Sequence, residues 1–122
     1  MHEMSLAESV REIAEEIARA NRARRVRGIH LRIGRLAGVD PAALGFGLEV
    51  ALRGGVTDGA AVHLQHVPGE AWCWDCAARV EVDSDPPSCP ACRSLRLQVT
   101  GGQELKVSEV ELADIEGEAT CA

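Results

Sequence analysis

The sequence lacks any long apolar run. No stretch of about 18 consecutive apolar residues occurs in it, so no segment can cross a bilayer as a helix. Its N-terminal segment carries Glu3 and Glu8, whereas a secretory signal carries basic residues before an apolar stretch. We therefore expect a cytoplasmic protein that has no membrane as a partner.

An excess of basic charge is also missing. Thirteen Lys and Arg stand against nineteen Asp and Glu, which gives a net charge of −6. This balance predicts no nucleic-acid partner, because nucleic-acid affinity comes largely from positive charge set against phosphates. Five arginines do cluster where the first predicted helix ends, and we interpret them as a solvated helix C-terminus, with a docking patch for an acidic partner as the alternative: Arg19, Arg22, Arg24, Arg25 and Arg27.

Catalytic patterns are absent as well. The chain shows no Ser-His-Asp order, no phosphate-binding glycine loop and no convincing pair of carboxylates, so we expect a protein that is not an enzyme. His30 alternates with apolar residues, while His63 and His66 lie on opposite faces of one predicted strand by parity. We expect these histidines to be ordinary surface or half-buried residues and not a shared metal site.

Apolar periodicity predicts a small α+β domain. Residues 5–20 read as an amphipathic helix with its apolar stripe on Leu6, Val10, Ile13, Ile17 and Ala20, and Ser5 with Glu8 resembles a capping box. A second helix should begin at Asp40-Pro41 and end before the glycines at 54–55. Alternating patterns predict strands near 26–33, 61–67 and 104–112. The expected fold is two helices on a three-stranded sheet, with an inserted four-cysteine lobe like a zinc ribbon.

The insertion divides the chain into domains. We expect one α+β domain from residues 1–68 and 101–114, a zinc-binding domain at 69–100, and a loose tail at 115–122 that contains Cys121 as a free thiol. About thirty residues are too few to sustain a hydrophobic core without help. The inserted lobe should therefore fold only when it holds a metal.

Four cysteines form two pairs with the spacing of metal-binding knuckles. Cys73 and Cys76 make one C-x-x-C turn, and Cys89 and Cys92 make the other twelve residues later. Four thiolates at this spacing can close tetrahedrally on one Zn(II), which leaves no open coordination position for a substrate. The tetrad predicts a structural zinc site. In a reducing compartment this reading is favoured over disulfides.

The first three residues, Met1-His2-Glu3, carry a second set of possible ligands. The α-amine of Met1, the amide nitrogen of His2 and its imidazole can form fused chelate rings, with the Glu3 amide or carboxylate near a fourth position. This nitrogen-rich, planar set suits Ni(II) or Cu(II) better than tetrahedral Zn(II). The alternative is a frayed N-terminus in which His2 has no functional role.

The order of these features resembles the HypA family of nickel-incorporation proteins in [NiFe] hydrogenase maturation. The resemblance rests on Met1-His2-Glu3 at the start, Gly38-Val39-Asp40-Pro41 after the first strand, and the two cysteine knuckles, and it covers about residues 1–112. It implies a metallochaperone that binds Ni(II) through His2 and neighbouring backbone nitrogens, with Glu3 assisting. The four cysteines then hold structural Zn(II).

The resemblance also implies partners. The GTPase HypB and the hydrogenase large subunit are expected to dock, urease maturation proteins are possible recipients, and the chain is expected to be a monomer or weak homodimer. Trp74 and the tail depart from the pattern, and no histidine flanks the knuckles to change the zinc ligands. A rival from another class is a zinc-ribbon adaptor that binds nucleic acid or protein, for which the tetrad is the only support.

Overall fold

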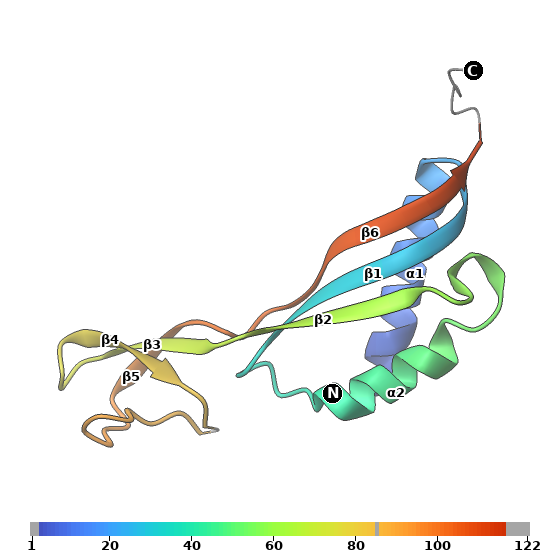
Figure 1. Cartoon of the computed structure of the whole chain (residues 1–122). Coiled ribbons are helices and arrows are strands. Elements are labelled where there is room, and N and C mark those ends of the chain that lie inside the picture. Colours follow the sequence, from blue (N-terminus) through green and yellow to red (C-terminus); the bar gives the residue numbers. More distant parts are fainter. Residues whose placement is uncertain (1–2, 85, 117–122) are drawn as a thin grey trace. The chain divides into compact units, whose positions relative to one another are not determined.

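A computed structural model describes residues 3–84 and 86–116 of the chain (Figure 1). These residues form two compact units. Unit 1 comprises the described residues 3–31, 40–64 and 107–116, and unit 2 comprises 32–39, 65–84 and 86–106. The predicted α+β class is confirmed, with two helices, small sheets and four clustered cysteines. Within the described residues, no helix combines the length and hydropathy needed to cross a membrane.

Helix α1 (Glu3–Ala20) begins two residues earlier than predicted and ends where predicted. Ser5 therefore lies inside the first turn, and the expected capping box is wrong. The buried stripe also differs from the predicted one, since it consists of Ala7, Val10, Ala14 and Ala18, whereas Ile13 is 43% exposed. Small alanine side chains let the helix backbone approach its neighbours closely. The prediction gave most weight to large apolar residues, and it therefore missed the buried alanines.

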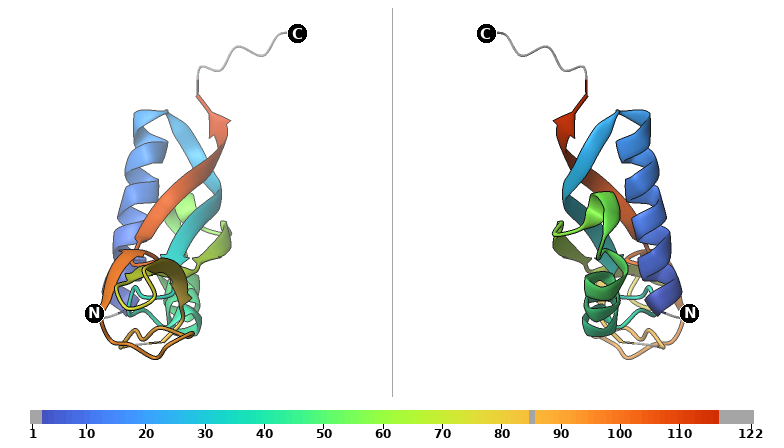
Figure 2. Two further views of the ribbon diagram at one scale, coloured as in Figure 1. Left: turned by 90° about the vertical axis from the view of Figure 1, so that its left-hand side faces the viewer. Right: turned by 90° about the vertical axis from the view of Figure 1, so that its right-hand side faces the viewer.

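The main sheet has the predicted three strands, in the order β2-β1-β6. Their bounds are β1 Ala23–Gly34, β2 Ala61–Val67 and β6 Leu105–Ile115. In unit 1, α1 covers one face of the strands (Figures 1 and 2). Ile29 and Leu31 of β1 are fully buried, as the alternation of apolar and polar residues in this strand predicts.

Helix α2 (Pro41–Ala51) connects β1 to β2, which run in the same direction (Figure 1). Such a pair needs a crossover connection, and a helix is the usual one. Asp40 caps α2 as predicted, because its Oδ1 accepts a hydrogen bond of 3.0 Å from the Ala42 amide. The side chains of Leu44 and Leu48, on the inner face of α2, are fully buried. A short 3₁₀ helix, η1 (Gly55–Thr57), precedes β2.

Unit 2 contains a second sheet, which is antiparallel and which the sequence patterns did not predict. Its order is β4-β3-β5, with β3 at Gly69–Cys73, β4 at Ala78–Val82 and β5 at Leu97–Gly101. Strand β3 pairs with β4 in regular register, and its pairing with β5 is irregular between Glu70 and Ala71. We call residues 69–101 the four-cysteine lobe, since both knuckles lie within them.

Three glycines of unit 2 allow backbone segments to approach closely. A Cβ added at Gly34 or at Gly69 would overlap a neighbouring carbonyl oxygen, that of Gly102 or of Val82 respectively. Gly102 has φ +87°, and a Cβ there would come within 2.5 Å of the Gly69 Cα. Hydrogen bonds hold these segments, including 2.7 Å from the Leu36 amide to the Gly102 carbonyl. Only glycine fits these positions.

Candidate metal centre

The structure brings the four predicted cysteines together in unit 2. All four Sγ atoms lie within 4.8 Å of one another. Cys73 ends β3, and Cys76 follows in the turn before β4. Cys89 and Cys92 lie in the turns that precede β5. In each pair the first cysteine is buried and the second is exposed, so the cluster has one side in the lobe and one side at its surface.

The sulfur spacing fits one tetrahedrally coordinated ion. The Sγ atoms of Cys73 and Cys92 are 3.6 Å apart, and those of Cys76 and Cys89 are 3.8 Å apart. A regular tetrahedron with metal–sulfur bonds of about 2.3 Å has edges of about 3.8 Å. A disulfide would need sulfurs about 2.05 Å apart, so these thiols are unbridged. The donor set and its spacing fit Zn(II).

Both knuckles have the same backbone form. The Cys76 amide donates to the Cys73 Sγ at 3.4 Å, and the Cys92 amide donates to the Cys89 Sγ at 3.5 Å. The residue after each pair, Ala77 or Arg93, has a left-handed backbone with φ of 52° and 62°. Non-glycine residues adopt this conformation rarely and at some cost. This repeated backbone form turns both sulfurs of each pair toward a common point.

The thiols of the cluster differ in acidity. Hydrogen bonding, chiefly from the backbone amide of Cys92, lowers the pKa of Cys89 to about 7. Hydrogen bonding with neighbouring thiols, Cys92 first, raises the pKa of Cys76 to about 12. Cys76 and Cys89 therefore do not ionise together without a cation. A bound divalent ion supplies the compensating charge, and its binding releases thiol protons.

Asp75 links the first knuckle to the segment that follows the second knuckle. Its Oδ1 accepts a hydrogen bond of 2.9 Å from the Arg96 guanidinium, and its Oδ2 accepts one from the Ser94 hydroxyl. The Ser94 hydroxyl oxygen in turn accepts from the Arg96 amide at 3.0 Å. Trp74, which precedes Asp75, is 55% exposed and meets Trp72 edge to face, with ring centroids 6.3 Å apart. These contacts connect the first knuckle to the segment after the second.

The predicted nickel ligands fall only partly within the described residues. Met1 and His2 lie outside them, as does Cys121, whereas Glu3 is the first residue of α1 and is half-buried. The start of α1 packs against α2 at Gly47. A Cβ added to Gly47 would lie 3.3 Å from the Met4 Sδ and 3.6 Å from the Glu3 carbonyl oxygen. Close packing of α2 therefore fixes the backbone that follows the predicted chelate.

The histidines are arranged differently from the sequence prediction. His30 and His63 come together across neighbouring strands, and their stacked rings have centroids 4.4 Å apart. Glu111 of β6 joins them, with its Oε1 3.1 Å from the His30 Nε2. His66 is not part of this group. The parity rule correctly separated His63 from His66, but it contains no information on which residues pair across strands.

The chain has close relatives among known proteins. The sequence model of the family described as HypA, hydrogenase/urease nickel incorporation, metallochaperone, matches residues 1–112. The hydrogenase maturation factor HypA of Azoarcus sp. (strain BH72) is 48% identical over 114 residues, which cover 93% of this chain and 100% of that protein. The factor of the same name from Rhodobacter capsulatus is 46% identical over 112 residues, covering 92% and 99%.

A solved structure supports the fold independently. The solution structure of the Ni metallochaperone HypA from Helicobacter pylori matches with a TM-score of 0.65 at 24% identity, over 92% of this chain and 97% of that chain. The clustered cysteines, the α+β fold and the sequence match over residues 1–112 agree with one another. The chain belongs to the HypA family of nickel-incorporation metallochaperones of hydrogenase and urease.

Proposed function

We propose that this chain carries Ni(II) at its N-terminus as cargo for [NiFe] hydrogenase maturation. The ligands are the α-amine of Met1, the amide nitrogen and imidazole of His2, and the amide or carboxylate of Glu3. The observation that carries the proposal is that α1 begins at Glu3. The first four amides of a helix have no acceptor within the helix, so the Glu3 amide can turn to a metal without loss of a helical hydrogen bond.

Electrostatics favour this site when a backbone amide is deprotonated. A helix N-terminus carries a partial positive charge, which by itself repels a cation. The ionised His2 amide, together with either the ionised Glu3 amide or the Glu3 carboxylate, supplies two negative charges against the two positive charges of Ni(II). The resulting chelate is neutral, and it therefore escapes most of the repulsion. A terminal set with so few side-chain ligands can also be taken apart by a receiving site, as delivery without catalytic turnover requires.

The four cysteines hold Zn(II) as a resident structural ion in this proposal. An all-cysteine tetrad is closed and has no position for exchange with a partner. The burial of Cys73 and Cys89, at 0% and 1% exposure, supports retention of the metal. Nickel and zinc thus occupy sites of different chemistry, one nitrogen-rich and terminal, the other sulfur-rich and enclosed by the four-cysteine lobe.

The recipients follow from family membership. We propose that the chain acts in the cytoplasm, as a monomer or weak homodimer, and docks on the GTPase HypB and the hydrogenase large subunit. Urease maturation proteins are an alternative destination, because the family description includes both hydrogenase and urease.

A nickel titration of tag-free, zinc-loaded protein tests the proposed cargo site. Three proteins are compared: the unaltered chain, His2→Ala, and a chain whose Met1 α-amine is acetylated. The substitution removes the imidazole, and acetylation removes the amine as a ligand while it keeps every side chain. We expect one strong Ni(II) site in the unaltered chain and at least about a tenfold loss of affinity in both variants.

His66→Ala is the matched control, since it removes an exposed imidazole that belongs to no ligand cluster in the described part of the chain. It should bind nickel like the unaltered chain. Zinc content, measured on the same samples, should stay at one ion per chain in all four proteins. Equal nickel affinity in the unaltered chain, His2→Ala and the acetylated chain would contradict the proposed site.

A further inference from the structure

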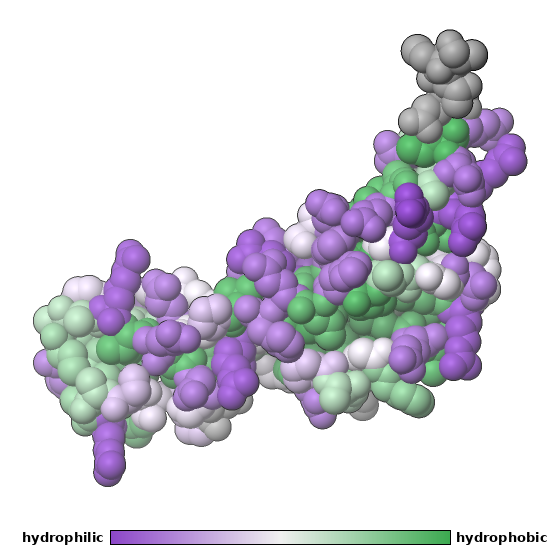
Figure 3. All heavy atoms as spheres, in the orientation of Figure 1, coloured by the Kyte–Doolittle hydropathy of each residue, from purple (hydrophilic) through white to green (hydrophobic). Residues whose placement is uncertain are grey.

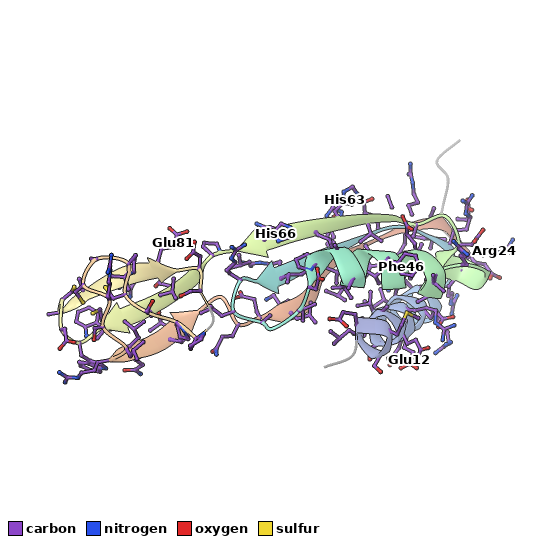
Figure 4. All side chains as sticks on the ribbon, turned by 90° about the horizontal axis from the view of Figure 1, so that it is seen from below. Glu12, Arg24, Phe46, His63, His66 and Glu81 are labelled. Carbon is purple, nitrogen blue, oxygen red and sulfur yellow. The ribbon has the colours of Figure 1, made fainter. Side chains whose placement is uncertain are left out.

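The face of the main sheet that α1 leaves uncovered carries a group of possible metal ligands in unit 1. His30 lies on the central strand β1, His63 on β2 and Glu111 on β6, so each of the three strands contributes one side chain. One ligand atom from each lies within 4.8 Å of those from the other two. Figure 4 shows His63 on the side of the sheet away from α1, and in Figure 3 this face carries hydrophilic residues among hydrophobic ones.

The three side chains already contact one another. The His30 Nε2 is 3.1 Å from the Glu111 Oε1, and the rings of His30 and His63 stack with an interplanar angle of 18°. A second carboxylate, that of Glu109, lies 3.5 Å from the same His30 nitrogen. Two imidazoles and two carboxylates thus gather at one place on the surface. Their combined charge favours a cation there.

The backbone beneath this group provides room for the carboxylate. Gly28 lies two residues before His30, on the same face of β1, and it is buried although this face is open to solvent. A Cβ at Gly28 would come within 2.5 Å of the Glu111 Oε2 and 3.2 Å of its carboxyl carbon. The Glu111 carboxylate therefore occupies the space that a side chain at residue 28 would fill, and from there its Oε1 reaches His30.

We propose that His30, His63 and Glu111 form a further transition-metal site, which binds a borderline divalent ion such as Zn(II) or Ni(II). Two imidazole nitrogens and one carboxylate oxygen are ligands that these ions accept. Bonds of about 2.0 Å place ligand atoms about 3.3 Å apart in a tetrahedral site, so the two stacked rings must turn out of their nearly parallel planes until a nitrogen of each points at the ion. The exposed fractions of His30 and Glu111, 32% and 46%, leave them free to rotate.

The site is separate from the two sites of the proposed function. It uses neither Met1-His2-Glu3 nor any cysteine, and its fourth position is filled by water or by Glu109. Its open position and exposed ligands predict weaker and faster binding than in the cysteine tetrad. A cation held there can exchange readily with solution, with another protein or with a stronger chelate.

The test uses full-length, zinc-loaded chain that carries His2→Ala, so that the N-terminal chelate is removed. ZnCl₂ and NiCl₂ are titrated separately by calorimetry. We expect one additional ion to bind, with at least about a tenfold loss of affinity after His63→Gln or Glu111→Gln. Gly28→Ala should also weaken binding, because it displaces the carboxylate and leaves all three ligands present.

His66→Gln in the same background is the matched control, since it changes a histidine of the same strand that lies outside the group. It should bind the additional ion normally. NMR spectra provide a second readout, in which the ring signals of His30 and His63 shift together on metal addition and those of His66 do not. No additional ion in the His2→Ala background, or equal binding by His63→Gln and His66→Gln, would overturn the proposal.

Discussion

Cys89→Ser is expected to unfold the four-cysteine lobe and to leave unit 1 folded. Among the described residues of the lobe, the fully buried apolar side chains are Ala71, Cys73, Val82 and Cys89. Half of that core therefore consists of metal ligands. Structural zinc contributes about 10–16 kcal/mol in small zinc domains, which is as large as the total stability of many domains, about 5–15 kcal/mol. Without a closed site, the remaining burial cannot hold the lobe.

Backbone amide NMR spectra of the full chain measure this effect residue by residue. Signals from 69–101 should collapse toward random-coil positions in Cys89→Ser, and zinc content should fall well below one ion per chain. Signals from α1 and from the β1 core should keep their native shifts. Cys121→Ser is the matched control, because it makes the same chemical change outside the tetrad, and it should change neither quantity. A lobe that stays folded and zinc-free in Cys89→Ser would contradict the structural role of the metal.

Gly102→Ala is expected to cause a large loss of stability in unit 2. The new Cβ would approach the Gly69 Cα to 2.5 Å and the Pro68 carbonyl oxygen to 2.6 Å. Neither atom belongs to a flexible side chain, so the backbone itself must move. The left-handed φ of +87° adds a further cost to alanine. Together these effects should lower the free energy of unfolding by about 2–5 kcal/mol.

Two other glycines separate the contributions to this loss. Gly38 has φ +73° and open space around its Cβ position, so Gly38→Ala should cost only about 1–2 kcal/mol from backbone conformation. Gly45 lies in α2 with nothing nearby, and Gly45→Ala should stabilise by up to about 1 kcal/mol. Urea unfolding of zinc-loaded protein measures all three. Equal losses in Gly102→Ala and Gly38→Ala would show that close packing is not the cause.

Local periodicity and spacing were sufficient to predict much of this molecule. Strand β2 has the predicted bounds, 61–67, and α2 begins at Pro41 behind its Asp40 cap as predicted. The cysteine knuckles could be read from spacing alone, because a C-x-x-C turn positions its own two sulfurs. These features depend on residues that are close in sequence. The geometry of one strand, one helix or one turn is enough to determine their positions.

Features that depend on pairing between distant segments were missed. The short strand β4 has only two apolar alternations, Val80 and Val82 beside Arg79 and Glu81, and this brief pattern becomes a strand by pairing with β3. The meeting of His30 with His63 and Glu111 depends on the order β2-β1-β6, which no local pattern contains. The signal that could have identified it is the position of all three on the solvent face of strands that were predicted to share one sheet.

The separation of nickel from zinc is tested most directly by X-ray absorption at both metal edges of one sample. The sample is tag-free protein with one equivalent of Zn(II) and one equivalent of Ni(II). The account predicts four sulfur neighbours at about 2.3 Å around zinc and a nickel shell of nitrogen and oxygen only. It further predicts that the nickel spectrum changes in His2→Ala while the zinc spectrum does not. Sulfur in the nickel shell, or histidine nitrogen in the zinc shell, would contradict it.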